Sequence, residues 1–233
     1  MSGFLRCITC GKQYPLDEIR YLCTCDGLLA AQRPDGWSRS LSTAQFDARR
    51  AAPKSEADQS GVWRFREGVL DAAPAEIVTH PEGATRLYRR PPLSRWAGIE
   101  ELAFKHEGEN PTASFKDRGM TVALTQAVRL KARAVACAST GNTSSSLAAY
   151  AAQAGVGAVV FVPSGKVSMG KLAQTLAYGA LTLKVKGDFD AAMELVMKAS
   201  QSLSSFQLPR KTWYWAPGSR WLTHLGNRRG SDA

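Results

Sequence analysis

Between residues 77 and 208, apolar positions switch repeatedly between the spacing of a helix and the short runs of a buried strand. The stretches "AVACA" and "AVVFVP" are compact apolar runs that end at small polar residues or at proline. After Lys116, apolar residues recur on one face of a helix, at Met120, Leu124, Ala127 and Val128. This alternation predicts an α/β domain.

The order of these segments predicts the topology of the sheet. Strands are expected at residues 101–105, 134–138, 158–163 and 181–185. Helices are expected from Lys116 onward, at 143–154, at 168–178, and from a cap at Asp188 or Asp190 to about Ser200. Because the connections are short and strand follows helix, the sheet should be parallel with right-handed crossovers, in a three-layer arrangement.

The chain divides into four zones. A Cys-rich ribbon at residues 1–30 is followed by a connecting arm at 31–75, in which we expect little core. The α/β domain occupies 76–208, and a basic, Trp-rich tail follows at 209–233. The tail shows neither helical nor strand periodicity, and it ends before another strand–helix unit can form. We therefore expect the α/β domain to be incomplete.

Composition and charge narrow the functional class. The chain is 44% hydrophobic, has no apolar run near the ~20 residues of a membrane span, and begins without a secretory signal, so a cytoplasmic protein is expected. Its net charge is +10. Residues 210–233 hold five basic residues and one acidic residue, which leaves +6 spread over the remainder. This distribution favours an enzyme with an anionic substrate over a nucleic-acid binder.

Lys116, within "NPTASFKDRGM", begins a predicted helix that Ser114 or Asn110 could cap. The positive end of the helix dipole favours the neutral amine, which is the form that attacks an aldehyde. The alternative is a surface lysine paired with Asp117 or Glu107.

The stretch "ASTGNTSSS" connects a predicted strand to a helix, at the edge where open α/β sheets bind ligands. Gly141 permits close backbone approach, while hydroxyl and amide groups come from Ser139, Thr140, Asn142 and Thr143. The alternative is a helix cap made of small polar residues.

Together, "NPTASFKDRG" and "ASTGNTSSSLAAYAAQAG" resemble the fold-type II pyridoxal-phosphate enzymes of the tryptophan synthase beta-like superfamily, and most closely the threonine synthases. The resemblance includes "FKHEG" and "FVPSGKVSMGKLAQTLAYGA" and extends from about Gly83 to Leu208. The Cys-bearing N-terminus is also similar to that of many threonine synthases.

The resemblance implies pyridoxal 5′-phosphate as cofactor and an amino-acid phosphate as substrate. By this resemblance Lys116 holds the cofactor covalently and later moves protons, and Asn142 hydrogen-bonds the oxygen on the cofactor ring. Ser139, Thr140, Gly141 and Thr143 bind the substrate carboxylate at a helix N-terminus. Lys105 and Arg118 could assist an anionic substrate, although surface pairing is the expected role of each. A homodimer is compatible with this assignment.

The implied reaction converts O-phosphohomoserine and water to threonine and phosphate. Two alternatives stay open. One is another enzyme of the same superfamily, such as a serine or threonine dehydratase or a β-replacement enzyme. The other is a basic zinc-ribbon protein that binds RNA or a protein partner.

The sequence departs from the family pattern at three places. Arg86 stands where relatives have the proline of a Thr-Pro-Leu motif. No glycine-rich phosphate loop follows Lys116, and the chain is shorter than full-length relatives. We therefore expect a truncation, most simply a frameshift near Leu208 or Pro209, and impaired catalysis.

Four cysteines form the pattern C-x2-C-x12-C-x-C at Cys7, Cys10, Cys23 and Cys25. Clustered thiols in a cytosolic chain are typical of tetrahedral zinc sites. The second pair is one residue closer than usual, so a ribbon that folds without metal is the alternative. Cys137 is expected to be a small buried residue.

Overall fold

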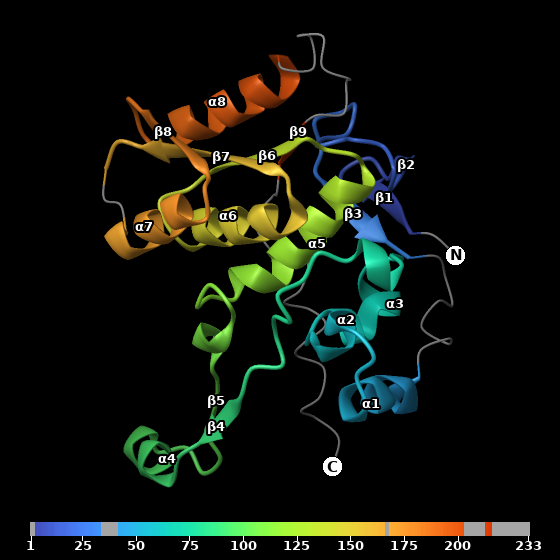
Figure 1. The fold of residues 1–233 in the computed structure, drawn as a ribbon, viewed down its shortest axis with the longest axis vertical. Helices are drawn as coiled ribbons and strands as arrows, with labels where there is room; N and C mark the ends of the chain where they lie inside the picture. Colours follow the sequence, from blue (N-terminus) through green and yellow to red (C-terminus); the bar gives the residue numbers. More distant parts are fainter. Residues whose placement is uncertain (1–2, 34–41, 166–167, 203–212, 216–233) are drawn as a thin grey trace.

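The computed structural model describes residues 3–33, 42–165, 168–202 and 213–215. At its centre is a parallel sheet with the strand order β8-β7-β6-β9 (Figure 1). Its strands are β6 Ala134–Ala138, β7 Gly157–Pro163, β8 Leu181–Val185 and β9 Trp213–Trp215. The parallel α/β arrangement predicted from the sequence is confirmed.

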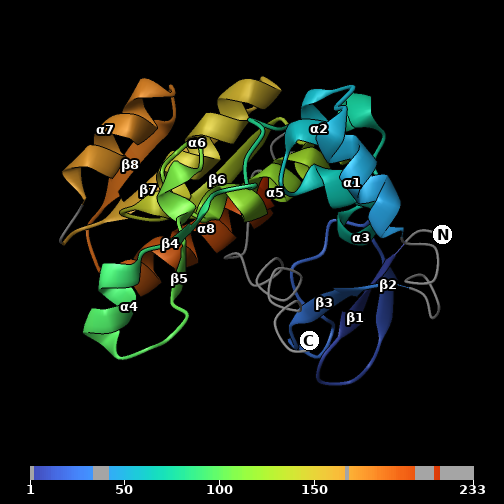
Figure 2. The same ribbon diagram turned by 90° about the horizontal axis from the view of Figure 1, so that it is seen from below.

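Helices cover both faces of this sheet, as Figures 1 and 2 show. On one face lie α5 (Lys116–Arg129), α6 (Asn142–Ala154) and α7 (Met169–Ala177), and on the other lies α8 (Phe189–Ser202). Side chains along β6 alternate between these layers. Val135 and Cys137 join the cluster formed with α5 and α6, whereas Ala136 and Ala138 join the cluster formed with α8. The three-layer prediction is therefore correct.

Element boundaries agree with the sequence to within about two residues. Strands β6 and β8 cover the predicted residues, and β7 begins one residue earlier, at Gly157. Helix α6 begins at Asn142 and ends at Ala154, and its C-cap Gly155 takes the left-handed conformation that glycine favours (φ 64°). Asp188 caps α8 through the backbone N–H of Ala191 (2.9 Å).

The tail contains one strand that its sequence does not reveal. Residues Trp213–Trp215 pair in parallel with β6, in the register Ala134↔Trp213 to Ala136↔Trp215. The sequence shows no clear strand periodicity here, because three residues are too few to show a period of two. Residues 203–212 and 216–233 lie outside the described part of the chain, and with them the predicted break near Leu208 and Pro209.

The Cys-rich ribbon is a three-stranded antiparallel sheet of order β2-β1-β3. It consists of β1 Phe4–Cys7, β2 Gln13–Pro15 and β3 Leu29–Gln32. The ribbon contacts the α/β domain near the end of α5, where the Gln126 side chain donates to the carbonyl oxygen of Leu16 (2.7 Å).

The connecting segment folds into short helices: α1 Thr43–Ala51, α2 Glu56–Gln59, η2 Trp63–Phe65, α3 Arg66–Val69 and η3 Pro74–Glu76. Contrary to expectation, it has a core cluster of its own, built around Trp63, whose side chain is fully buried. The Trp63 indole N–H donates to Thr121 Oγ1 of α5 (2.6 Å). This bond fixes the segment on the α/β domain.

A projecting arm precedes α5 (Figure 1). It contains β4 Leu87–Arg89, α4 Pro91–Ala97, β5 Ala103–Lys105 and the turn η4 Glu107–Glu109, with β4 and β5 antiparallel. Strand β5 is two residues shorter than predicted. The arm exposes large apolar side chains, at Leu87, Leu93, Trp96, Ile99 and Phe104.

Among the described residues, no helix is both long enough and apolar enough to cross a membrane.

Candidate functional site

Lys116 is the first residue of α5, and its side chain is half-buried. Its backbone N–H donates to Ser114 Oγ (3.1 Å), so Ser114, and not Asn110, accepts from the first N–H of this helix. The Lys116 ammonium lies 4.7 Å from the centre of the exposed Phe115 ring. Ala113, three residues before, has φ 58°, in the left-handed region that a residue with a Cβ seldom adopts. The backbone is therefore strained directly beside the lysine.

The carboxylates that could have paired with Lys116 are engaged with other groups. Asp117 is fully buried and accepts from Thr112 N–H (2.7 Å), Thr112 Oγ1 (2.6 Å) and Ser146 Oγ (2.6 Å). Glu107 forms a two-pronged ion pair with Arg118, with distances of 2.8 Å from Nε and 2.9 Å from Nη2. The expected pairing of Arg118 is thus confirmed.

Lys105 does not form the expected ion pair among its described contacts, since its ammonium donates to the backbone carbonyl of Thr85. Burial lowers the pKa of Lys105, and the neighbouring charge of Arg118 lowers it further. Lys105 therefore lies in a partly buried position beside Arg118.

The loop at residues 139–143 follows β6 directly and leads into α6. Ser139 Oγ accepts from the backbone N–H groups of Gly141 (3.2 Å) and Ser144 (3.3 Å), so this hydroxyl caps α6. Asn142 is exposed, and Thr140 and Gly141 are half-buried. A Cβ added to Gly141 would have no heavy atom within 4 Å, which leaves open space beside the loop.

Helix α7 contacts both the lysine loop and the 139–143 loop. The Lys171 ammonium donates to the carbonyl oxygen of Thr112 (2.6 Å), and the Ser168 N–H donates to the carbonyl oxygen of Thr140 (3.2 Å). Sequence reasoning missed Thr112, Asp117, Ser146 and Lys171 as members of this region. The only available signal was position in the sequence: Thr112, Asp117 and Ser146 lie within the two motifs, and Lys171 lies within "FVPSGKVSMGKLAQTLAYGA".

The segment with Arg86 in place of proline is held by its own hydrogen bonds. The backbone N–H of Arg86 donates to Glu109 Oε2 (2.7 Å), a bond that proline cannot make. Just before it, the Gly83 N–H donates to Asn110 Oδ1 (2.9 Å). With arginine in place of proline at residue 86, the backbone loses the rigidity of the proline ring. It gains a hydrogen bond to the turn that precedes Lys116.

Glu82, which opens this segment, is fully buried in the body of the protein. Its carboxylate accepts from Ser60 Oγ, from Thr79 Oγ1 (3.0 Å) and from the Tyr150 hydroxyl of α6 (2.7 Å). Burial raises the pKa of Tyr150, and the negative charge of Glu82 raises it further. The phenol therefore stays protonated and donates to Glu82.

The four ribbon cysteines converge, and their sulfur atoms all lie within 4.8 Å of one another. Cys7 and Cys25 sulfurs are 3.6 Å apart, and Cys10 and Cys23 sulfurs are 3.5 Å apart. Four thiolates about 2.3 Å from a tetrahedral zinc ion lie about 3.8 Å from each other. The donor set and spacing therefore fit a zinc ion, and the short C-x-C pair does not prevent convergence.

Two of these thiols lie where the ionised form is favoured. The Tyr14 hydroxyl, 3.1 Å from Cys23 Sγ, lowers the pKa of Cys23 to about 5. The backbone N–H of Cys10 lowers the pKa of Cys7. Thiolate is the form that binds metal.

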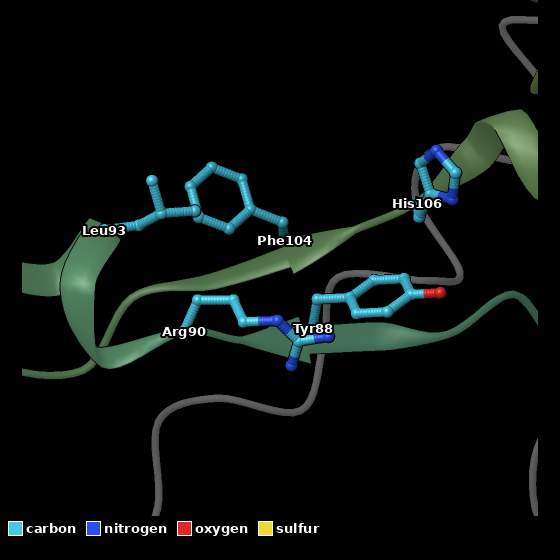
Figure 3. Close-up of a pocket in the computed structure, with 5 residues that line it drawn as sticks. All are labelled: Tyr88, Arg90, Leu93, Phe104 and His106. Atoms are coloured by element: carbon cyan, nitrogen blue, oxygen red, sulfur yellow. The ribbon is translucent and has the colours of Figure 1, made fainter.

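A separate shallow groove lies on the projecting arm (Figure 3). Its lining consists of Tyr88, Arg90, Leu93, Phe104 and His106. The Arg90 guanidinium lies 5.0 Å from the centre of the Tyr88 ring, and His106 meets the same ring edge-on. Neither Lys116 nor the 139–143 loop contributes to this groove.

Known proteins resemble this chain in sequence and in fold. The threonine synthase of Methanocaldococcus jannaschii is 45% identical over 196 residues, which are 84% of this chain and 46% of that protein. The threonine synthase of Methanosarcina acetivorans is 46% identical over 82% of this chain and 45% of its own length. The chain thus spans about half the length of the curated relatives it matches.

Among solved structures, the diaminopropionate ammonia lyase of Escherichia coli aligns with 75% of this chain and 40% of its own. The TM-score is 0.51 and the sequence identity is 19%, a likeness of fold alone. Residues 78–225, more than half of the chain, match the family model described as pyridoxal-phosphate dependent enzyme. The chain belongs to the pyridoxal-phosphate dependent enzyme family.

Proposed function

We propose that this chain is the lysine-bearing part of a threonine synthase, which converts O-phosphohomoserine and water to threonine and phosphate. The observation that carries the proposal is the 45% identity to the Methanocaldococcus jannaschii threonine synthase over 84% of this chain. The fold likeness to the ammonia lyase does not favour a dehydratase, because it is likeness of architecture only.

The residues around Lys116 support binding of pyridoxal phosphate. A half-buried amine at a helix start suits covalent attachment to an aldehyde, and the exposed Asn142 amide can donate to the ring oxygen. The space beside Gly141 leaves room for a ring to approach. When bound, the cofactor supplies an electron sink for carbanion chemistry at the substrate α-carbon.

The chain's own groups would bind the substrate and move protons. The N-terminus of α6, which follows the β6 loop, would suit a carboxylate, together with Thr140 and Thr143. Ser139 would contribute indirectly, because its hydroxyl already caps α6. Lys116, once released from the cofactor, would take the substrate proton and return it.

We also propose that Cys7, Cys10, Cys23 and Cys25 bind one structural zinc ion. Support comes from the four sulfur atoms, which all lie within 4.8 Å of one another. A cytoplasmic location fits both the reduced thiols and this chemistry, and a homodimer is compatible with it.

Chemical labelling tests the lysine. Purified chain mixed with pyridoxal phosphate should turn yellow, and borohydride should fix one label per chain on Lys116, located by peptide mass spectrometry. Lys116→Arg, which keeps the charge, should lose that label, whereas Lys171→Arg should keep it. A wild-type chain whose Lys116 takes no label would refute the cofactor assignment.

The reaction is tested by which product appears. We expect phosphate release from O-phosphohomoserine and no ammonia release from serine or threonine. Ammonia release with no phosphate release would instead establish a dehydratase. Because the chain spans about half the length of its relatives, the assay should be run with and without a C-terminal half of the Methanosarcina acetivorans protein co-expressed as a separate chain.

A further inference from the structure

Asp117, next to Lys116 in sequence, is a fully buried carboxylate. Thr112 donates to it twice, from its N–H (2.7 Å) and its hydroxyl (2.6 Å), and Ser146 donates once (2.6 Å). Thr112 and Ser146 are themselves fully buried. We call Thr112, Asp117 and Ser146 the Asp117 network. It joins the first turn of α5 to α6 within the layer shown in Figure 1.

The network reaches both candidate cofactor residues through rigid helical turns. Ser146 lies four residues after Asn142, so the two residues share one face of α6. Asp117 follows Lys116 in the first turn of α5. The bond from Ser146 to Asp117 therefore fixes the turn that carries Asn142 against the turn that carries Lys116.

The same network also reaches α7. The carbonyl oxygen of Thr112 accepts from the Lys171 ammonium (2.6 Å), while its N–H and hydroxyl serve Asp117. The hydrogen bonds of Thr112 and Asp117 thus link the helices α5, α6 and α7. Thr112 lies three residues before Phe115, the last residue of the loop that leads into α5.

A buried carboxylate is an energetically unfavourable link between two helices. Burying a carboxylate costs free energy that its hydrogen bonds only offset, and apolar residues of similar volume often stabilise a fold more. Hydrogen bonds do impose direction and distance, which apolar contacts do not. The value of the Asp117 network therefore lies in alignment more than in stability.

We infer that Asp117 is a positioning residue that holds Lys116 and Asn142 in fixed relative orientation through Ser146. The inference rests on the proposed function, in which these two residues bind the same cofactor. A displacement of about 1 Å in such a pair is enough to cost a hundredfold in a reacting geometry.

Two buried serines in α6 provide a matched test. Ser146→Ala removes the bond to Asp117, whereas Ser145→Ala removes a bond inside α6, from Ser145 Oγ to the carbonyl oxygen of Asn142 (3.2 Å). Both serines are fully buried, so both variants lose one hydroxyl from the same helix. Ser146→Thr keeps the hydroxyl and serves as the rescue variant, and Asp117→Asn removes the charge with little change of shape.

The first readout is the pyridoxal phosphate concentration that half-saturates the borohydride-fixed label on Lys116. Ser146→Ala and Asp117→Asn should raise it at least tenfold, Ser145→Ala less than twofold, and Ser146→Thr should restore it. The melting temperature should fall in both alanine variants, and further in Ser146→Ala, because that change leaves a buried carboxylate with one hydrogen bond fewer. Equal half-saturation in Ser146→Ala and Ser145→Ala overturns the inference.

The second readout needs no cofactor, and so separates this inference from the proposed function. Amide hydrogen exchange of residues 141–144 in the cofactor-free chain should be at least tenfold faster in Ser146→Ala than in Ser145→Ala. If wild-type Lys116 takes no label but exchange differs as expected, the function fails while the positioning role stands. Equal exchange in the two variants refutes the role whatever the label shows.

Discussion

The Cys-rich ribbon and the α/β domain are stabilised by different means. Around α5 and α6, apolar side chains such as Leu124, Leu147 and Tyr150 are completely buried in a cluster that spans helices and sheet. The ribbon cluster consists of Cys7, Tyr14 and Cys23, with Leu5 and Leu29 packed against it. Two members of the ribbon cluster are therefore candidate metal ligands and not hydrocarbon side chains.

This contrast indicates what each region needs in order to fold. A unit of about thirty residues cannot bury enough apolar surface to offset its conformational entropy, and such units usually depend on metals or disulfides. The ribbon cysteines are all free thiols, so metal is the available cross-link. The α/β domain has the apolar burial that the ribbon lacks and should fold independently of metal.

The largest expected effect is loss of the ribbon on metal removal. Structural zinc held by four cysteines supplies about 10 kcal/mol or more of apparent binding free energy, which becomes folding free energy. We expect one zinc per reduced chain by elemental analysis. A chelator should abolish amide protection in residues 3–33 and leave it in α5 and α6.

Substitutions separate the ligands from the other thiol. Cys7→Ser removes one thiolate ligand and should therefore reduce the zinc content to below about 0.1 per chain. Cys137→Ala, in the α/β core, should keep full zinc content. A protected ribbon in a chain free of metal would show that the contrast between the two regions is wrong.

The next effect is loss of apolar burial in the α/β domain. Leu147→Ala should destabilise the chain by about 2–5 kcal/mol, because Leu147 is fully buried between α6 and the sheet. Leu176→Ala, at an exposed position of α7, should change stability by less than about 0.5 kcal/mol. Urea denaturation followed by circular dichroism measures both, and a loss below about 1 kcal/mol for Leu147→Ala contradicts the prediction.

The same contrast explains what could be predicted from sequence. Within the α/β domain, local periodicity and turn residues located β6, α6 and β8, because each helix or strand there buries a regular face. The motif positions also placed Lys116 at a helix start, and they placed Asn142 one residue before a helix that in the structure begins at Asn142. In this region local pattern and tertiary environment agree.

Features that depend on distant partners could not be predicted. Trp63 is buried by Thr121, 58 residues later, so its segment was expected to have little core. Asp117 was a candidate partner of Lys116, and only the fold brings Ser146 to it, 29 residues away. Strand β9 exists because the edge of β6 offers backbone groups, whatever the side chains of residues 213–215.

A smaller effect concerns strain in the loop before Lys116. Ala113 has φ 58°, and an alanine there costs about 1–2 kcal/mol relative to a residue without a Cβ. Ala113→Gly should therefore stabilise the α/β domain by about 1 kcal/mol, part of the gain being offset by the greater freedom of glycine in the unfolded chain. The ribbon should be unaffected, because its stability is set by metal.

Ala73→Gly is the matched control, since Ala73 has φ −67°, an ordinary conformation for alanine. That variant should lose a few tenths to about 1 kcal/mol. Urea denaturation of the zinc-bound chain compares the two. If both variants are destabilised alike, the strain at Ala113 is not real.

The smallest effect concerns two individual thiols, Cys23 in the ribbon and Cys137 in the α/β core. In the ribbon, the Tyr14 hydroxyl lowers the pKa of Cys23 to about 5, whereas burial in the α/β core raises the pKa of Cys137 to about 12. Because the unfolded pKa of a thiol is near 9, the native chain keeps the Cys137 proton at a pH where the unfolded chain loses it. The stability due to Cys137 is therefore complete below pH 9 and declines as the pH rises towards 12.

At pH 9 the decline due to Cys137 is only about 0.4 kcal/mol, the free energy of half-ionising one thiol in the unfolded state. The measurement is the change in unfolding free energy between pH 7 and pH 9, in wild type and in Cys137→Ala. The variant should lose about 0.4 kcal/mol less over this interval, since alanine has no proton to release. Iodoacetamide at pH 9 should modify Cys10 in the metal-free chain and spare Cys137. Equal pH dependence in the two proteins, together with rapid alkylation of Cys137, would mean that the α/β core does not exclude water from this thiol. The comparison between a buried core and a metal-dependent ribbon would then fail at Cys137.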